Sequence, residues 1–297
     1  MPVKNFQTDG ETAVYSFPTW FDFVDEAKQR TTPVKDADAA SRQPDIAKWA
    51  QTNTFDDAFK LAERGWAAGA SRVNTLGEAM FDELSGLIRK PQVVFSEEPG
   101  LDIDVSRYAD GEQDCFIHLE DEIKRGHSRQ IVRLVYNATA SSSVPAEIIV
   151  ARGATVAALV MMMEYSGAGV EVVAFIGCSE KNEINYPSNR GKAIEVYCTV
   201  KPSDQPVEVT SLAYALAHPS TFRRFGFGVM EGHPDPKARD ALSVPGYYGY
   251  PCEASHQGDL YIPAAKASDQ TWLNPQSARL WVIDALKQQG VAMFAVT

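Results

Sequence analysis

The amino-acid sequence predicts an α/β fold, namely an open, mostly parallel sheet with helices on both faces and an N-terminal, mainly helical extension. Two observations lead to this prediction. From Ile131 onward, short apolar runs that are typical of strands alternate with longer runs of helical character. One of these runs, residues 170–176, is almost entirely apolar, as expected for a parallel strand that is covered on both faces.

The N-terminal part, residues 1–128, is less regular, and we expect it to pack on a body formed by residues 129–297. An aromatic stretch at residues 16–28 predicts a short helix or strand against that body. Residues 31–45 are polar and contain two prolines, which is typical of a linker. Residues 101–126 predict a strand or turn followed by a surface stretch.

Two helices are predicted between these segments. Thr54 followed by Asp57 resembles a helix cap, and Gly65 follows the apolar face that this cap opens. The second helix covers residues 73–89 and ends before Pro91.

The body is predicted to alternate strands and helices. Ile131–Asn137 is the first strand, and we expect it in the middle of the sheet. Ala193–Lys201 alternates polar and apolar residues, which predicts an edge strand antiparallel to the rest. The other expected strands are residues 170–176, 225–230, 259–264 and 291–296, and the expected helices are residues 145–166, 210–224 and 274–289.

The formal net charge of −11 argues against a general polyanion-binding surface. One basic cluster stands apart, and it comprises Lys124, Arg125, Arg129 and Arg133. It is interpreted either as a solvated connector or as a contact for single-stranded nucleic acid. The second interpretation fits an accessory protein of transcription or replication, in which a tyrosine-rich loop with Tyr247, Tyr248 and Tyr250 provides stacking surfaces.

The cysteine pattern and the N-terminus indicate a cytoplasmic protein. The four cysteines are widely spaced and form no CxxC pair, so we expect reduced thiols and no structural zinc site. The first residues lack the charged-then-apolar layout of a secretory signal. No uninterrupted apolar run reaches the roughly 18–20 residues that a membrane helix needs.

The most informative local feature is the end of the first strand, where Asn137, Thr139 and Ser141 follow an apolar run. Alternate positions of an extended segment point the same way, so these three polar side chains are expected to converge. Open α/β sheets place their ligands at such carboxyl ends of strands. The alternative interpretation is that Asn137 and Thr139 only tie down the turn between strand and helix.

With these residues the region 129–297 resembles a von Willebrand factor A domain. The family motif Asp-x-Ser-x-Ser corresponds to Asn137-x-Thr139-x-Ser141, the family threonine to Thr210, and the later Asp-Gly to Glu231-Gly232. The resemblance implies a metal-ion-dependent adhesion site and a protein partner at the top face of the sheet. The helix and strand after Ser141 also resemble the domains that partner MoxR-type ATPases. The chain as a whole resembles phage-encoded proteins, which implies the host cytoplasm as its compartment and a role of the nucleic-acid-binding alternative in phage transcription or replication.

The departures from the motif bear on the metal. Asn137 replaces a charged ligand by a neutral amide, and Mg²⁺ normally demands carboxylate ligands. The remaining candidate ligands are Thr139, Ser141, Thr210 and Glu231. The sequence therefore predicts weak or absent Mg²⁺ binding, and no other cofactor.

These observations together predict a non-catalytic binding or scaffolding protein. The expected contact residues are Asn137, Thr139, Ser141, Thr210, Glu231, Tyr247, Tyr248 and Tyr250. The first alternative is the nucleic-acid-binding protein described above. The second is a hydrolase in which Ser141 acts as nucleophile with His218 or His233 as its base.

Overall fold

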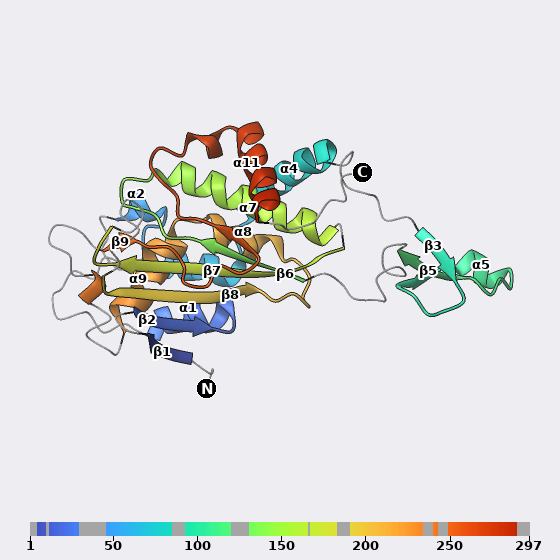
Figure 1. Ribbon diagram of the computed structural model, residues 1–297, viewed down its shortest axis with the longest axis horizontal. Coiled ribbons are helices and arrows are strands. Elements are labelled where there is room, and N and C mark those ends of the chain that lie inside the picture. Colours follow the sequence, from blue (N-terminus) through green and yellow to red (C-terminus); the bar gives the residue numbers. More distant parts are fainter. Residues whose placement is uncertain are drawn as a thin grey trace.

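The structure is a computed structural model of the chain, and it describes residues 5–9, 12–29, 46–84, 93–119, 131–165, 167–182, 191–233, 240–242 and 249–289. Figure 1 shows a central sheet with helices packed on it, and a smaller sheet that lies apart. The α/β class predicted from the sequence is confirmed.

The central sheet has seven strands within the described residues, in the order β1-β2-β8-β7-β6-β10, with β9 paired to β7. Parallel pairs join β6 to β7, β6 to β10, and β2 to β8, whereas β1–β2, β7–β8 and β7–β9 are antiparallel. The strands are β1 (Asn5–Asp9), β2 (Thr12–Phe17), β6 (Ile131–Asn137), β7 (Gly169–Ser179), β8 (Ala193–Lys201), β9 (Tyr250–Pro251) and β10 (Leu260–Ile262).

The predicted position of β6 is confirmed, because it has parallel neighbours on both sides. The prediction for β8 is half right. It is antiparallel to β7, but it is not an edge strand, because β2 pairs with its other side. The alternation in β8 misled because Glu195, a polar residue, is fully buried. Its carboxylate accepts hydrogen bonds from Tyr197 and Ser255 instead of facing water.

The strand predicted at residues 225–230 is wrong. A π-helix occupies Thr221–Gly226, and α9 continues it over Phe227–Glu231. Every residue of both elements is buried. A helix buried on all sides has no polar face, so its sequence shows no helical periodicity and is easily read as a short apolar strand.

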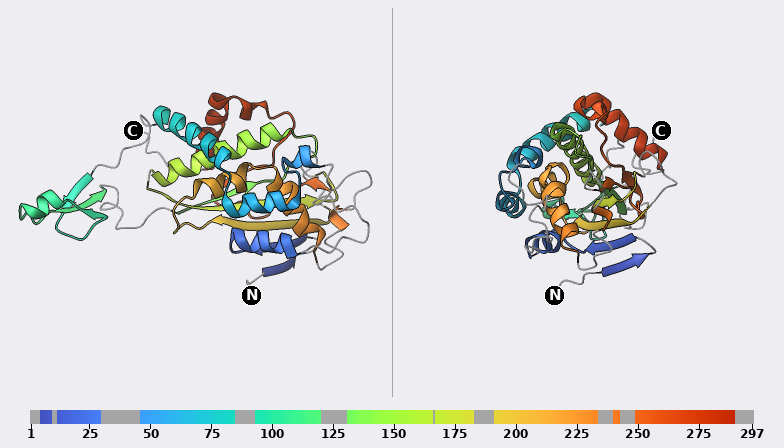
Figure 2. Two further views of the ribbon diagram at one scale, coloured as in Figure 1. Left: turned by 180° about the vertical axis from the view of Figure 1, so that it is seen from behind. Right: turned by 90° about the vertical axis from the view of Figure 1, so that its left-hand side faces the viewer.

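The helices of the main body are α1 (Trp20–Gln29), α2 (Ala47–Ala50), α3 (Phe55–Arg64), α4 (Ala67–Leu84), α7 (Ala146–Tyr165), α8 (Val209–Ala217) and α11 (Pro275–Gln288), with 3-10 turns at Asp240–Leu242 and Gln270–Leu273. The buried residues of α1, α3, α7, α8 and α11 share one continuous core with Val132, Leu134 and Tyr136 of β6. Figure 2 shows these helices wrapped around one side of the sheet.

The opposite face of the sheet has a separate small core around Val135, Phe175 and Tyr197. The core also includes Tyr261 of β10, and an extended segment that contains Cys252 and Ala254 packs on it. In the described part of the chain, this face therefore carries an extended segment where the sequence predicts helices.

The N-terminal part enters the main body more deeply than a helical extension would. Its strand β2 pairs with β8 over the whole length of β2, from Thr12 opposite Ala193 to Phe17 opposite Cys198. The predicted cap of α3 is confirmed, since Thr54 Oγ1 accepts from the Asp57 N–H at 3.0 Å. Helix α4 begins at Ala67, six positions before the predicted start, and packs on α7 and α8.

By length and composition, α7 is the one described helix that could cross a membrane. However, 78% of its most apolar window is buried inside the protein. A helix that is buried to this extent is packed as a core helix. Gly153 lets α7 approach α8 closely, because a Cβ at this position would lie 2.2 Å from the Leu216 carbonyl O.

Residues 93–119 form a second, three-stranded antiparallel sheet in the order β3-β5-β4. Its elements are β3 (Val93–Ser96), β4 (Asp102–Ile103), α5 (Val105–Ala109) and β5 (Phe116–Leu119). We call this unit the acidic module. The sequence predicted only a strand or turn and a surface stretch here. The segments on either side of the module, residues 85–92 and 120–130, lie outside the described residues.

Candidate functional site

The end of β6 is the candidate site, and Asn137 lies at its centre. The side chain is fully buried. Its Nδ2 donates to the Cys252 carbonyl O at 2.9 Å and to the Tyr261 hydroxyl at 3.0 Å. Its Oδ1 accepts from the Thr139 N–H at 3.0 Å, which closes a turn of the Asx type. Asn137 thus ties the strand to a segment that lies 115 to 124 residues later in the chain.

Thr139 is buried beside Asn137, whereas Ser141 faces the surface. Thr139 Oγ1 accepts from the Gly177 N–H of β7 at 2.8 Å. Ser141 is partly exposed, and its Oγ lies 3.2 Å from Ser143 Oγ. The structure therefore brings Asn137 and Thr139 together but does not bring Ser141 to them. It supports the alternative interpretation, in which Asn137 and Thr139 hold the turn between strand and helix.

Arg152 closes the same edge from the helical side, and it was not singled out from the sequence. The side chain is buried within α7, and its guanidinium donates to the carbonyl oxygens of Asn137 at 3.0 Å, Ile262 at 3.3 Å and Pro263. It also lies over the Tyr136 ring at 4.3 Å. A buried arginine among carbonyl groups satisfies oxygen atoms that the ends of β6 and β10 leave unpaired. The signal was an arginine in the largely apolar stretch of α7 between Glu147 and Glu164.

Thr210 lies at the other end of the body, so its predicted place in the site is wrong. Strand β8 runs antiparallel to β7, and its last residue, Lys201, binds Glu164 near the end of α7 at 2.6 Å. Thr210 follows at the start of α8, where its hydroxyl bonds the Glu208 carboxylate at 2.9 Å. The other end of α8 reaches Gly153 in the first half of α7. The helix therefore starts at the edge of the sheet opposite to Asn137.

Glu231 is also displaced from the candidate site. It ends α9, not a strand, and it is buried. Two residues later, the His233 ring packs on Tyr15 of β2 with 4.3 Å between the ring centroids. Two strands, β8 and β7, separate β2 from β6. At about 4.8 Å per strand this is roughly 14 Å across the sheet.

The residues of the expected metal site therefore do not fit Mg²⁺. The two oxygen atoms that would be ligands, Asn137 Oδ1 and Thr139 Oγ1, each already accept a backbone N–H. Thr210 and Glu231 lie elsewhere. In the described ranges no three His, Cys, Asp or Glu side chains are grouped so that they could hold a metal ion. Among the described residues, this end of the sheet therefore offers no octahedral shell of oxygen ligands.

Two further predicted contact sites fall largely outside the described residues. Tyr250 is partly exposed in β9, opposite Ser179 of β7. Tyr247 and Tyr248 lie outside the described residues, as do Lys124, Arg125 and Arg129. Arg133 is described, and its Nε lies 3.3 Å from the Glu171 carboxylate. Its charge is therefore offset by a neighbouring strand.

The histidines proposed as bases for Ser141 have other positions. His218 Nδ1 lies 2.7 Å from Ser220 Oγ, which in turn lies 2.7 Å from the Tyr214 hydroxyl. All three side chains are buried, and burial lowers the pKa of His218 to about 4. This chain of hydrogen bonds joins the end of α8 to the π-helix. Ser141 instead has Ser143 as its described side-chain partner.

Two tyrosines fasten the extended segment over the second face of the sheet. The Tyr261 hydroxyl accepts from the Ala254 N–H at 3.1 Å and donates to the Glu253 carboxylate. The Tyr197 hydroxyl accepts from the His256 N–H at 3.1 Å and donates to Glu195 at 2.8 Å. Burial, and then the adjacent carboxylate, raise the pKa of each tyrosine above its ordinary value. Both hydroxyls therefore stay protonated and can donate.

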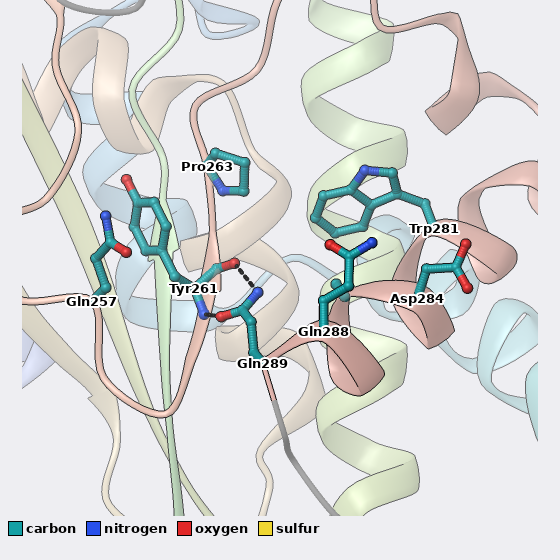
Figure 3. Close-up of a pocket in the computed structure, with 8 residues that line it drawn as sticks. Gln257, Tyr261, Pro263, Trp281, Asp284, Gln288 and Gln289 are labelled. Atoms are coloured by element: carbon teal, nitrogen blue, oxygen red, sulfur yellow. Dashed lines mark hydrogen bonds between the residues drawn. The ribbon is translucent and has the colours of Figure 1, made fainter. Parts of the chain in front are cut away.

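A hollow of about 440 Å³ lies beside β10 and α11, and Figure 3 shows its lining. The Gln289 side chain spans the outer edge of β10, where it accepts from the Tyr261 N–H at 2.7 Å and donates to the Tyr261 carbonyl O at 3.1 Å. One side-chain amide thus pairs with the strand as a neighbouring strand would. No pattern in the sequence predicted this edge contact.

The fold and the end of β6 define the class of protein. It is an α/β protein in which internal hydrogen bonds close the carboxyl end of the central strand. The family model described as "Domain of unknown function (DUF7192)" matches residues 4–292, so the chain belongs to this family. No curated protein and no solved structure matches the chain.

Proposed function

We propose that the protein is a non-catalytic binding or scaffolding protein that engages a macromolecular partner at the carboxyl edge of β6. The observation that supports this is the loop after Thr139, which is anchored at both ends. Ala140 pairs with Ala265, and Val144 is buried. The Arg223 guanidinium donates to the Val144 carbonyl O at 2.8 Å. Between these anchors, Ser142 and Ser143 are exposed.

A loop that is fixed before binding loses little conformational entropy when a partner docks on it. The end of β6 beneath this loop is rigid as well, because the polar groups of Asn137, Thr139 and Arg152 are bonded to the protein itself. The edge is thus arranged to present a surface. The resemblance to von Willebrand factor A domains implies a protein partner, and a MoxR-type ATPase is the partner class that we propose. The proposed compartment is the cytoplasm.

The described residues do not favour either alternative. For nucleic acid, Arg133 is paired with Glu171 and the chain carries a net charge of −11. For hydrolysis, the described side-chain partner of Ser141 is another serine.

Site-specific photo-crosslinking in cells that naturally produce the protein tests the proposal. The photoreactive residue benzoylphenylalanine replaces Ser142 at the proposed surface. The matched control replaces Tyr165, which is 72% exposed at the far end of α7. We expect protein adducts from position 142 and none from position 165. Equal labelling at both positions, or none at 142, contradicts the proposed surface. An adduct with a protein other than an ATPase supports binding but contradicts the partner class.

A further inference from the structure

The acidic module differs from the rest of the protein in its charge. Between Val93 and Leu119 the sequence has seven carboxylates and a single guanidinium, that of Arg107. The module therefore carries a net charge of −6, which is more than half of the −11 of the whole chain. The carboxylates are Glu97, Glu98, Asp102, Asp104, Asp110, Glu112 and Asp114.

The module also exposes apolar side chains on its helix α5. Val105 is 71% exposed and Tyr108 is 65% exposed. Residues three apart lie on the same face of a helix, so these two side chains form one small apolar surface. Leu101, which precedes β4, and Val93 in β3 are exposed as well.

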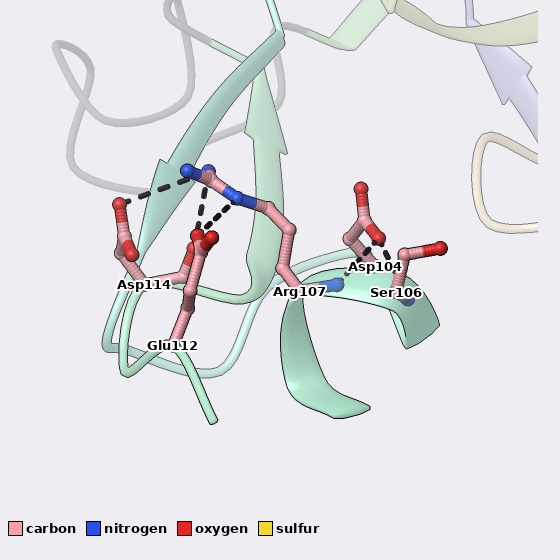
Figure 4. A network of polar contacts seen from close by, with 5 residues as sticks. All are labelled: Asp104, Ser106, Arg107, Glu112 and Asp114. Atoms are coloured by element: carbon pink, nitrogen blue, oxygen red, sulfur yellow. Dashed lines mark hydrogen bonds and ion pairs between the residues drawn. The ribbon is translucent and has the colours of Figure 1, made fainter. Parts of the chain in front are cut away.

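Arg107 fixes α5 with this apolar face turned outward. Its guanidinium lies 4.1 Å from the Phe95 ring centroid, and Nε lies 2.6 Å from the Glu112 carboxylate. A second contact runs from Nη1 to the Asp114 carboxylate at 3.7 Å. Figure 4 shows this network together with the Asp104 carboxylate, which caps the helix by accepting from the Ser106 and Arg107 N–H groups. Val105 is two residues from Arg107, which is about 200° around the helix, so it points away.

The module has a very small core of its own. Among the described side chains of residues 93–118, only Cys115 and His118 are fully buried. A unit of this size cannot bury enough apolar area to be stable without additional support. The uncovered face of α5 offers such area to another molecule.

We infer that the face formed by Val105 and Tyr108 is a docking surface for a basic protein segment that carries apolar side chains. The tyrosine provides a large anchor with little loss of side-chain freedom. The surrounding carboxylates attract positive charge and repel negative charge. A second copy of the chain would bring another −6 to the same place. Nucleic acids are repelled for the same reason.

Binding to a synthetic probe tests this inference with the full chain. The probe is an amphipathic peptide of about 16 residues, roughly four helical turns, with leucine on one face and lysine on the other. A second peptide has glutamate in place of every lysine. We expect saturable binding of the lysine peptide by fluorescence anisotropy, weakened at high salt. The glutamate peptide is expected not to bind. Equal binding of the two peptides overturns the charge part of the inference.

Variants locate the surface. The double substitution V105S/Y108S is expected to weaken binding about tenfold or more. The matched control is Y165S/L280S, which removes exposed apolar groups from the main body and should stay within about twofold. A second variant, E97Q/D110N, keeps the apolar face and is expected to weaken binding several-fold at low salt. Equal losses in the two serine variants, or none in V105S/Y108S, overturn the inference. So does a dimer in sedimentation equilibrium that V105S/Y108S dissociates, because the occupant is then a second copy.

Discussion

The carboxyl end of β6 and the acidic module differ in how far their side chains are buried and bonded within the protein. At the edge, the side chains of Asn137, Thr139 and Arg152 are buried and bonded to the protein's own backbone. In the module, Val105 and Tyr108 stand in solvent, and the charge is almost all of one sign. At the edge these polar groups are satisfied by the protein itself, whereas the apolar side chains of the module become buried only when a partner binds. Buried polar residues at a strand end therefore indicate internal support, whereas exposed apolar residues on a short helix indicate a contact surface.

The largest effect is expected from Asn137→Asp. A carboxylate cannot donate to the Cys252 carbonyl O, which lies 2.9 Å from Nδ2 in the native protein. It would place a buried negative charge against an oxygen atom, at a cost of about 3–5 kcal/mol of unfolding free energy. Denaturant titration measures this loss. Calorimetric titration with Mg²⁺ should show no gain of affinity. Tight Mg²⁺ binding by the variant would contradict the description of the edge as closed.

Acid is expected to destabilise the main body through His218. Its folded pKa is about 4, below the 6.5 of an unfolded histidine, so between these values only the unfolded chain binds the proton. The stabilisation is present above pH 6.5 and is lost as the pH falls toward 4. The largest loss of unfolding free energy expected from this histidine is about 3 kcal/mol. Comparing unfolding of the native chain and His218→Asn at several pH values isolates this contribution. If the unfolding free energy of the variant falls with pH as steeply as that of the native chain, His218 is not the cause.

Gly153→Ala tests the close approach of α7 to α8. The added Cβ would lie 2.2 Å from the Leu216 carbonyl O and 2.4 Å from the Ala217 Cα. Backbone atoms cannot rotate away, so the helices must separate, at a cost of about 1–3 kcal/mol. Gly77→Ala in α4 is the control, since its Cβ would meet only Ala158 Cβ at 4.0 Å. A stabilised Gly153→Ala variant would mean that the two helices are not packed as described.

Arg107→Ala should affect the module and leave the edge unchanged. The guanidinium bonds two carboxylates and covers Phe95, but it is 30% exposed, so the loss is about 1 kcal/mol. Hydrogen exchange should become faster in residues 93–119 and stay the same in β6 and β7. A change of similar size in both regions would show that the module and the body unfold as one unit.

The smallest effect is expected from V105S/Y108S on stability. These side chains are exposed, so their removal should change the unfolding free energy by no more than about 0.5 kcal/mol. Thermal unfolding of the full chain measures it. A large loss would place them in a core and contradict the outward face of α5.

Local patterns predicted the parts of the fold whose causes are local. The strand β6, the helix α7 and the cap at Thr54 were all predicted from the sequence, and the structure confirms each. The end of β6 was found for the same reason, because Asn137 and Thr139 follow an apolar strand. Their partners, Cys252, Tyr261 and Gly177, are remote in the chain, and spacing alone cannot reveal them.

The misplacement of Thr210 has a physical cause of the same kind. The sequence predicted that β8 is antiparallel to the rest of the sheet, and it is antiparallel to β7, although it is parallel to β2. A strand that runs antiparallel ends at the opposite edge of the sheet, so the helix after it begins there too. Motif order does not record this reversal. The buried π-helix was missed because nothing in an apolar run distinguishes a helix from a strand when every side is covered.

Hydrogen exchange of the full chain, with and without the lysine peptide, tests the contrast between edge and module most directly. Without peptide, amides of β6 and β7 should exchange only through global unfolding, and those of β5 roughly 100-fold faster through local opening. Addition of peptide should slow exchange in residues 93–119 and leave β6 and β7 unchanged. Equal protection of β5 and β6 without peptide, or slowing confined to the main body, would contradict the account.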